Sequence, residues 1–323
     1  MLDRYGRVIN YLRISVTDRC NLRCCYCMPE GVQDVGMKNI LTFEEIWEIV
    51  RTGVSLGITH IRITGGEPLV RKGCVDLIRG IREIPGVETI TMTTNGVLLG
   101  NYAKQLKEAG VDGVNISLDT LDPEEFYKIT GKRELQEVLA GIRAAKTAGL
   151  PVKLNAVNRK ELDPIPLVRY AQEENLPIRF IEMMPVGYGK KYVGRSNEEL
   201  RETLEAVCGN AECMTNREEL SRMGSGPAVY YQFSDLKVPV GFISAIHGKF
   251  CDTCNRVRLT AEGYLKLCLC YDEGEDLRRV LREGEKENLR TIMEQTIFRK
   301  PAAHCFEHPA EMTETHEMVK IGG

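Results

Sequence analysis

The segment Leu12-Arg-Ile-Ser-Val-Thr-Asp-Arg-Cys-Asn-Leu-Arg-Cys-Cys-Tyr-Cys27 decides the fold, because it joins a short strand to a cysteine-rich loop. In residues 12–17 apolar and polar side chains alternate, which predicts a strand with one buried and one polar face. Cys20, Cys24 and Cys27 then follow in a C-x3-C-x2-C spacing. Side chains at the carboxyl ends of parallel strands carry the chemistry of barrel enzymes, so this loop is a candidate site.

The strand pattern recurs in the first 190 residues, and helix-like stretches lie between the strands. Strands are expected at residues 12–17, 60–64, 89–93, 114–119, 152–157 and 178–183. Helices are expected at residues 42–56, 75–84, 102–109, 136–148 and 165–174. Thr42 followed by Glu45 predicts a capping box, and glycines at 57, 110 and 149 stand where helices should end. Strand–helix alternation predicts parallel βα units. We therefore expect an α/β fold with an incomplete (β/α)6 TIM-type barrel.

The pattern weakens near residue 190, which divides the chain into two expected parts. Residues 1–189 would form the partial barrel, and residues 190–323 a C-terminal α+β module that closes its lumen. In the module, strands are expected at residues 230–233, 240–244, 257–260 and 264–269. Helices are expected at residues 198–208, 277–282 and 285–298. No low-complexity linker separates the two parts, so we expect them to pack tightly.

The polar faces of the barrel strands predict a hydrated lumen. Parallel strands that are buried on both faces are usually continuous apolar runs, but these strands alternate. Four basic residues lie on the polar face: Arg13, Arg62, Lys153 and Arg179. Burying them without a counter-charge would be costly, so we expect an anionic ligand in the lumen. The alternative is that some of them lie at strand ends in solvent.

The composition is that of an ordinary globular enzyme. Of 323 residues, 43% are hydrophobic and 28% are charged, which excludes a disordered chain. The net charge of −3 gives no basic excess for nucleic acid or a membrane surface. No segment has the apolar core of a signal peptide or the length of a membrane span. We therefore expect a cytoplasmic protein, in which twelve cysteines favour metal binding over disulfides.

The first cysteine group consists of Cys20, Cys24 and Cys27. Thiolates are soft ligands that suit zinc or the iron of an iron–sulfur cluster. A structural zinc ion takes four protein ligands, whereas three cysteines on one loop leave a vacant position. This favours a four-iron cluster with one iron free for a substrate. The alternatives are a zinc knuckle or free thiols.

The second cysteine group consists of Cys251, Cys254 and Cys268, in a C-x2-C-x13-C spacing. Cys270 adds a candidate fourth ligand, so a closed zinc ribbon is the alternative to a second open cluster. Arg256 and Arg258 follow at alternate positions and can point one way from a strand. Because a closed site is inconsistent with this arginine pair, we expect Cys270 to be a buried thiol beyond the strand end.

The first cysteine group and three strand-end motifs together resemble the radical S-adenosylmethionine (radical SAM) superfamily. The motifs are Gly65-Gly66-Glu67-Pro68, Thr93-Thr94-Asn95-Gly96 and Ser117-Leu118-Asp119. The resemblance implies a [4Fe-4S] cluster whose free iron chelates S-adenosylmethionine. Reductive cleavage then yields methionine and a 5′-deoxyadenosyl radical, while the protein supplies positioning. Cys25 departs from the superfamily's usual pattern, and we do not expect it to be a ligand.

Within that superfamily, the segment Phe250-Cys-Asp-Thr-Cys-Asn-Arg-Val-Arg-Leu259 and the terminal Gly322-Gly323 resemble the GTP 3′,8-cyclase (molybdenum cofactor biosynthesis protein A) family. The resemblance covers essentially the whole chain. It implies conversion of GTP to (8S)-3′,8-cyclo-7,8-dihydroguanosine 5′-triphosphate in the first step of molybdenum cofactor biosynthesis. It also implies that the second cysteine group holds a second [4Fe-4S] cluster, to which the guanine of GTP binds.

The residues that this family uses can be assigned to matching positions of the chain. The implied GTP contacts are Arg13, Arg62, Thr93, Lys153, Arg179, Arg256 and Arg258. The implied S-adenosylmethionine contacts are Tyr26, Gly66, Ser117 and Met184. The implied catalytic residues are Arg256, Arg258, Gly322 and Gly323. The two glycines belong to a tail that reaches into the site in this family; the alternative is a disordered terminus.

The resemblance also implies partners. These are a cyclic pyranopterin monophosphate synthase that takes the product, an electron donor such as flavodoxin or ferredoxin, and a second copy in a homodimer. Two other interpretations stay open at this point. One is a radical SAM enzyme that modifies a peptide, with the C-terminal cysteines as an auxiliary cluster. The other is a zinc-binding interaction module in the C-terminal half.

Overall fold

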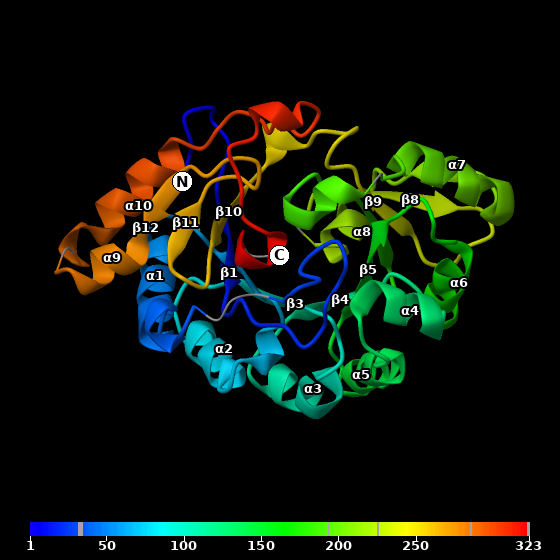
Figure 1. Ribbon diagram of the computed structural model, residues 1–323, viewed down its shortest axis with the longest axis horizontal. Coiled ribbons are helices and arrows are strands. Elements are labelled where there is room, and N and C mark those ends of the chain that lie inside the picture. The colour runs from blue at the N-terminus through cyan, green and yellow to red at the C-terminus, as the bar shows by residue number, and fades with distance from the viewer. Residues whose placement is uncertain (32–34, 193, 225, 285, 322–323) are drawn as a thin grey trace.

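The computed structural model describes residues 1–31, 35–192, 194–224, 226–284 and 286–321, and its strands form one twelve-stranded sheet (Figure 1). Six strands in chain order make the predicted barrel wall: β1 (Tyr11–Ser15), β2 (His60–Thr64), β3 (Thr89–Thr94), β4 (Gly113–Ser117), β5 (Val152–Asn158) and β6 (Ile178–Glu182). Each pairs with the next in parallel. The α/β class and the partial barrel are confirmed.

Helices cover the apolar face of this wall, and Figure 1 shows α1, α2, α3 and α5 following one another around its outside. The helices between the barrel strands are α1 (Phe43–Ser55), α2 (Cys74–Arg82), α3 (Leu99–Glu108), α4 (Pro123–Thr130), α5 (Leu135–Thr147) and α6 (Ile165–Glu173). Leu12 and Ile14 of β1 share a fully buried core with Ile46 and Ile49 of α1. The alternation therefore turns the apolar side chains outward to the helices and the polar ones inward.

The predicted helix ends are present. The Thr42 hydroxyl accepts a hydrogen bond from the Glu45 amide at 3.2 Å, and the Thr42 amide donates to the Glu45 carboxylate at 2.7 Å. Gly57, Gly110 and Gly149 follow α1, α3 and α5 with φ of 93°, 89° and 70°. Glycine occupies such left-handed conformations without steric cost, which is why these helices end there. The strand predicted at residues 12–17 is wrong at its end, because β1 stops at Ser15.

The C-terminal half extends the barrel wall at both edges. Its strands are β7 (Ala211–Cys213), β8 (Val229–Phe233), β9 (Val240–Ile243), β10 (Arg256–Leu259), β11 (Tyr264–Lys266) and β12 (Gly274–Asp276). β9 pairs in parallel with β6, and β10 pairs in parallel with β1. Antiparallel strands continue the sheet outward to β7 and β12. Within the described residues no pairing joins those two edges, so the wall is open.

The C-terminal half contributes the remaining helices. They are α7 (Asn197–Cys208), α8 (Arg217–Arg222), α9 (Leu277–Arg282) and α10 (Leu289–Phe298). In Figure 1 the segment after α10, coloured red, ends in front of the middle of the sheet. None of the helices in the described part of the chain is both long and apolar enough to span a membrane.

The hairpin of β10 and β11 ends earlier than predicted. Arg258 pairs with Lys266 across it, and the turn uses Gly263 with φ of 91°. Because β11 stops at Lys266, Cys268 and Cys270 lie in the loop that follows it. They are therefore not on one strand face, which was the arrangement that would have favoured Cys270 as a fourth ligand.

Candidate functional site

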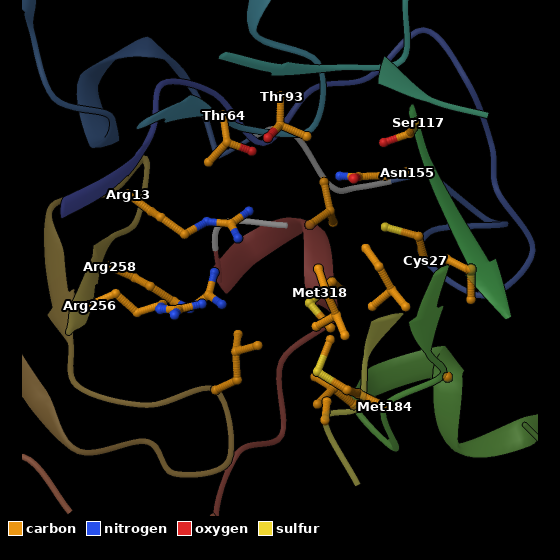
Figure 2. A pocket seen from close by; sticks show the side chains of 18 of the residues that line it. Arg13, Cys27, Thr64, Thr93, Ser117, Asn155, Met184, Arg256, Arg258 and Met318 are labelled. Atoms are coloured by element: carbon orange, nitrogen blue, oxygen red, sulfur yellow. The ribbon is translucent and has the colours of Figure 1, made fainter. Parts of the chain in front are cut away.

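One pocket brings the two cysteine groups together, although they come from opposite halves of the chain. Most of the predicted site residues line it: Arg13, Cys20, Cys24, Tyr26, Cys27, Arg62, Gly66, Thr93, Ser117, Arg179, Met184, Cys251, Cys254, Arg256, Arg258 and Cys268. Figure 2 shows Arg13, Arg256 and Arg258 on one wall and Cys27 with Ser117 on the opposite wall. Gly322 and Gly323 lie outside the described residues.

The first cysteine group lies on the loop after β1. Burial raises the pKa of Cys27 to about 12, and the neighbouring Cys20 adds to the rise. Burial also raises the pKa of Cys24, and the second largest cause is Cys27. The Asn95 side chain donates to the Cys20 sulfur at 3.7 Å. Three half-buried thiols that oppose one another's ionisation become thiolates more readily beside a positive group, which is what a metal centre supplies.

The Gly-Gly-Glu-Pro motif packs beside the loop of the first cysteine group and stabilises its surroundings. The buried Glu67 carboxylate accepts hydrogen bonds from the Thr94 hydroxyl at 2.8 Å and the Asn95 amide at 2.7 Å. A Cβ on Gly66 would lie 2.4 Å from the carbonyl oxygen of Arg19. Only glycine therefore fits there, and the backbone of the motif packs directly against the segment that leads into the cysteine loop.

Tyr26 is held by a carboxylate that the sequence analysis did not assign. Its hydroxyl donates to Asp119 at 2.7 Å, and the other Asp119 oxygen accepts from the Val157 amide at 2.8 Å. Burial raises the pKa of Asp119, and these hydrogen bonds oppose the rise. Asp119 follows β4 in the Ser-Leu-Asp motif, so it links the end of β4 to the cysteine loop.

The second cysteine group lies across the pocket. Cys251 and Cys254 precede β10, and Cys268 follows β11. Burial alone would raise the pKa of Cys254, but the positive charges of Lys300 and Arg256 outweigh it and the pKa is lowered. The Cys254 thiol is therefore more readily ionised than an ordinary one, because the protein itself provides positive charge beside it, whereas burial raises the pKa of Cys251.

Each group offers three sulfur donors to the shared pocket. Within the described ranges, no three His, Cys, Asp or Glu side chains converge closely enough to hold a single metal ion. Thiolate sulfur is the ligand that iron–sulfur clusters take from proteins. The chemistry of both donor sets fits such a cluster with one iron left for another ligand.

A row of arginines crosses the pocket on neighbouring strands. Arg13 of β1 lies opposite Arg258 of β10 on one side and Arg62 of β2 on the other. Burial, Arg258 and Arg62 together lower the pKa of Arg13 well below its ordinary value. Burial and Arg256 lower the pKa of Arg258 to about 10. Like charges held this close make the wall a strong site for a polyanion.

Arg179 and Lys153 occupy the β5–β6 side of the lumen. Arg179 lines the pocket and donates to Asn155 at 2.9 Å and to Asn115. Lys153 is not among the lining residues, since its ammonium donates to the Met223 carbonyl at 2.9 Å. Burial and the charges of Arg179 and Arg62 lower the pKa of Lys153 to about 8. Lys153 faces the lumen as predicted, but the loop at residue 223 screens it.

The segment after α10 supplies lining residues that sequence reasoning missed. They are Lys300, His304, Phe306, Met318 and Val319. Arg7 fixes the start of this segment, because its guanidinium donates to the carbonyls of Pro301 and Ala302 at 2.6 and 2.8 Å. The same guanidinium donates to the Cys251 carbonyl at 2.8 Å. The N-terminus thus ties the second cysteine group to the C-terminal segment.

Cys270 lies behind the pocket rather than in its lining. It is fully buried, and its sulfur lies 2.9 Å from that of Cys305. The Cys305 amide also donates to the Cys270 sulfur at 3.2 Å. Both thiols belong to a small apolar cluster with Leu269, Phe306 and Ile321. The contacts of Cys270 are therefore those of a buried thiol.

Comparison with known families finds two profiles that match successive parts of the chain. The radical SAM superfamily profile matches residues 14–164. A second profile, described as Molybdenum Cofactor Synthesis C, matches residues 176–306. The two profiles together cover both cysteine groups.

Curated relatives match over the full length of the chain. A GTP 3′,8-cyclase of Clostridium perfringens (strain 13 / Type A) is 42% identical over 330 residues, which is 100% of both chains. The GTP 3′,8-cyclases of Petrotoga mobilis and Thermodesulfovibrio yellowstonii are 43% and 45% identical, again over 100% of both chains.

Solved structures share the fold at low sequence identity. Streptococcus suis SuiB bound to S-adenosylmethionine has a TM-score of 0.66 at 15% identity, over 97% of this chain and 77% of that one. Native anSMEcpe with bound AdoMet has a TM-score of 0.58 at 18% identity, over 92% and 82%. Both structures align with more than nine-tenths of this chain, so the fold that they share with it includes its C-terminal half.

Proposed function

The chain belongs to the radical SAM superfamily and, over its whole length, to the GTP 3′,8-cyclase family, and on this premise we propose a role for each wall of its pocket. It is a GTP 3′,8-cyclase that acts in the first step of molybdenum cofactor biosynthesis. The observation that carries the proposal is that both cysteine groups and the arginine row line one pocket. A radical made at one wall then meets a substrate held at the other.

The wall formed by the first cysteine group binds S-adenosylmethionine. Cys20, Cys24 and Cys27 would hold the [4Fe-4S] cluster, which with S-adenosylmethionine supplies the 5′-deoxyadenosyl radical that takes hydrogen from C3′ of GTP. The proposed contacts to S-adenosylmethionine are Tyr26, Gly66, Ser117 and Met184, all of which line the pocket. Asp119 keeps the Tyr26 ring in place, because it accepts the hydrogen bond of its hydroxyl.

The opposite wall binds GTP. Guanidinium groups donate paired hydrogen bonds that match phosphate oxygens, so Arg13, Arg62 and Arg258 are proposed to hold the triphosphate. Thr93 and Arg179 complete the contacts from β3 and β6. Lys153 would join them by exchanging its hydrogen bond with the Met223 carbonyl for one with a phosphate. Neutralising this wall is the physical reason for GTP to bind there.

The second cysteine group completes the proposed site. Cys251, Cys254 and Cys268 would hold the second [4Fe-4S] cluster, and the guanine of GTP would bind beside it. Arg256 and Arg258 would act on GTP from the adjoining strand β10. The proposed roles of Gly322 and Gly323 are supported by their neighbours in sequence, since Met318 and Val319 line the pocket.

Anaerobic reconstitution tests the proposal. The expected preparation holds about eight irons, four for each cluster, and releases 5′-deoxyadenosine when GTP is added. Four irons together with one zinc would favour a zinc-binding C-terminal module instead. Release of 5′-deoxyadenosine that does not depend on GTP but requires a peptide would favour a peptide-modifying enzyme.

The remaining proposals concern the setting of the reaction. We propose that a cyclic pyranopterin monophosphate synthase takes the product, that flavodoxin or ferredoxin donates electrons, and that the enzyme works as a cytoplasmic homodimer. We also propose that the chain divides into a partial barrel over residues 1–189 and a C-terminal module over residues 190–323. Limited proteolysis and sedimentation measurements test the division and the oligomeric state.

A further inference from the structure

Lys300 is a buried lysine beside the second cysteine group. Its side chain follows α10, only 2% of the residue is exposed, and it lines the pocket together with Cys251, Cys254 and Cys268. Its ammonium donates to the carbonyl of Leu267, the residue before Cys268. In the part of the chain that the structure describes, no carboxylate lies within ion-pair distance of it.

A second buried lysine shows what is unusual about this arrangement. Lys266 is as deeply buried as Lys300, but its ammonium forms an ion pair with the fully buried carboxylate of Glu314. Taking an ammonium out of water costs several kcal/mol unless an opposite charge compensates it. The fold itself supplies the opposite charge for Lys266. For Lys300, the groups that could supply an opposite charge are the thiols beside it.

The charge of Lys300 reaches those thiols. It acts electrostatically on both Cys254 and Cys251, and among the charged groups that act on Cys254 it is the foremost. Lys249 also acts on Cys251, but its side chain is 42% exposed and forms an ion pair with Glu307. Solvent screens an exposed charge far more than a buried one. Lys249 is therefore a natural control for Lys300.

We propose that Lys300 is the counter-charge of the second [4Fe-4S] cluster and raises its reduction potential. This inference rests on the proposed function, which assigns the cluster to Cys251, Cys254 and Cys268. Three thiolates give the site a net negative charge, and reduction adds one more electron to it. A fixed buried ammonium stabilises the reduced form more than the oxidised one, and net charge is among the determinants of cluster potential.

The location of Lys300 makes this effect specific to one cluster. Lys300 contacts the loop of Cys268, whereas the first cysteine group lies on the opposite wall of the pocket. Lys300 would therefore raise the potential of the second cluster and leave that of the first nearly unchanged. An electron delivered to the pocket would then be retained at the wall where GTP binds.

The test isolates the second cluster in the full-length chain. A parent variant with Cys20, Cys24 and Cys27 all changed to Ala is reconstituted anaerobically, and its iron is counted. Lys300→Gln keeps a hydrogen-bond donor without the charge, Lys300→Met removes both, and Lys300→Arg keeps the charge. Lys249→Met is the matched exposed control. The midpoint of each is measured by titration with dithionite, which supplies the electron, and followed by electron paramagnetic resonance.

The expected result is a lower midpoint in both neutral variants. Losing the charge should shift the one-electron equilibrium toward the oxidised form by about tenfold, which corresponds to about 59 mV. Lys300→Arg and Lys249→Met should stay near the parent. Loss of iron from both neutral variants, with Lys300→Arg retaining it and all chains folded by circular dichroism, would also support a required charge.

Two results would overturn the inference. The first is an unchanged midpoint in a neutral variant that keeps its four irons. The second is loss of iron from Lys300→Arg as well, which would show that the shape of the side chain rather than its charge is needed. If the parent itself holds no iron, the proposed second cluster is wrong. Iron content shows this directly, so it is distinguished from a failure of the inference about Lys300, which the midpoints show.

Discussion

Arg13 and Arg258 lie directly opposite each other on the neighbouring parallel strands β1 and β10. Like charges directly opposite each other in a sheet are destabilising; here Arg258 is buried and Arg13 is half-buried. The two like charges therefore carry a cost that a polyanion bound between them would reduce. The relationship joins the two halves of the chain, since β1 starts the barrel and β10 belongs to the C-terminal half.

Removing either arginine of β10 should weaken GTP binding and spare S-adenosylmethionine binding. Each lost charge-assisted hydrogen bond costs about 1.5–3 kcal/mol, so Arg256→Ala and Arg258→Ala should each lower GTP affinity roughly ten- to hundredfold. Isothermal titration with each ligand measures this. Arg51→Ala, which changes an exposed arginine paired with Glu48, is the control. Unchanged GTP titrations in both β10 variants would count against a triphosphate site on this wall.

The depressed pKa of Lys153 makes ligand-free stability depend on pH. Below pH 8 the lysine is protonated in both the folded and the unfolded chain, so the cost of burying its charge is fully present. Between about 8 and its ordinary value of 10.5, only the unfolded chain keeps the proton, and stability therefore rises with pH. Lys153→Met should be more stable than the parent at pH 7 and lose this rise. Denaturant titrations at pH 7 and 9.5 measure both effects.

The same lysine should couple GTP binding to proton uptake. At pH 8 about half of the Lys153 side chains are neutral in the ligand-free protein, and a bound phosphate would favour the charged form. Calorimetry in two buffers of different ionisation enthalpy should show proton uptake that Lys153→Met abolishes. Equal proton uptake by the variant would mean that Lys153 stays on the Met223 carbonyl when GTP binds.

Two adjacent cysteines should behave differently when they are replaced. Cys24 lines the pocket, whereas Cys25 is not among the lining residues and accepts a hydrogen bond from Arg159 at 3.7 Å. Cys24→Ala should abolish S-adenosylmethionine cleavage, because it removes a cluster ligand. Cys25→Ala should retain cleavage. Deoxyadenosine assays under anaerobic conditions compare them, and cleavage that survives in Cys24→Ala would refute the ligand set.

The loop after β11 offers a similar pair. Cys268→Ser should lose the iron of the second cluster and GTP cyclisation, whereas Cys270→Ser should keep about four irons there and keep activity. The reason is that Cys270 packs against Cys305 behind the pocket. Iron and zinc analysis of the two variants measures this. Loss of iron from Cys270→Ser, or zinc in the parent, would contradict an open cluster.

Local patterns were sufficient to predict the barrel strands and the chemistry of the first loop. The alternation in β1 places Arg13 on the polar face, and each later barrel strand follows the same alternation. The polar, basic character of the lumen can therefore be predicted from the sequence alone. Helix α4 was missed although its signals are present: Asp122 caps it and Pro123 starts it. It is only eight residues long, which is too short for a clear periodic pattern.

Long-range pairing could not be predicted from the same patterns. Nothing in the residues of β10 says that its neighbour is β1, because that choice depends on packing of the whole C-terminal half. Lys300 illustrates the consequence. A lysine near a chain end is exposed in most proteins, and only the fold shows that this one is buried and that Arg7 fixes the backbone that follows it. The alternation correctly predicts that Lys153 faces the lumen, but it does not predict that the loop at residue 223 covers this lysine.

The parallel pairing of β1 with β10 also determines the order of events during synthesis. Chains fold from the N-terminus as they leave the ribosome, so β1 emerges long before its neighbour on that side. Until β10 is translated, β1 presents an unpaired edge of the kind that promotes association between nascent chains. The arginine row and the second cysteine group come together only when almost the whole chain is available. A cluster held by the second cysteine group, as proposed, would therefore be assembled after almost the whole chain has been translated.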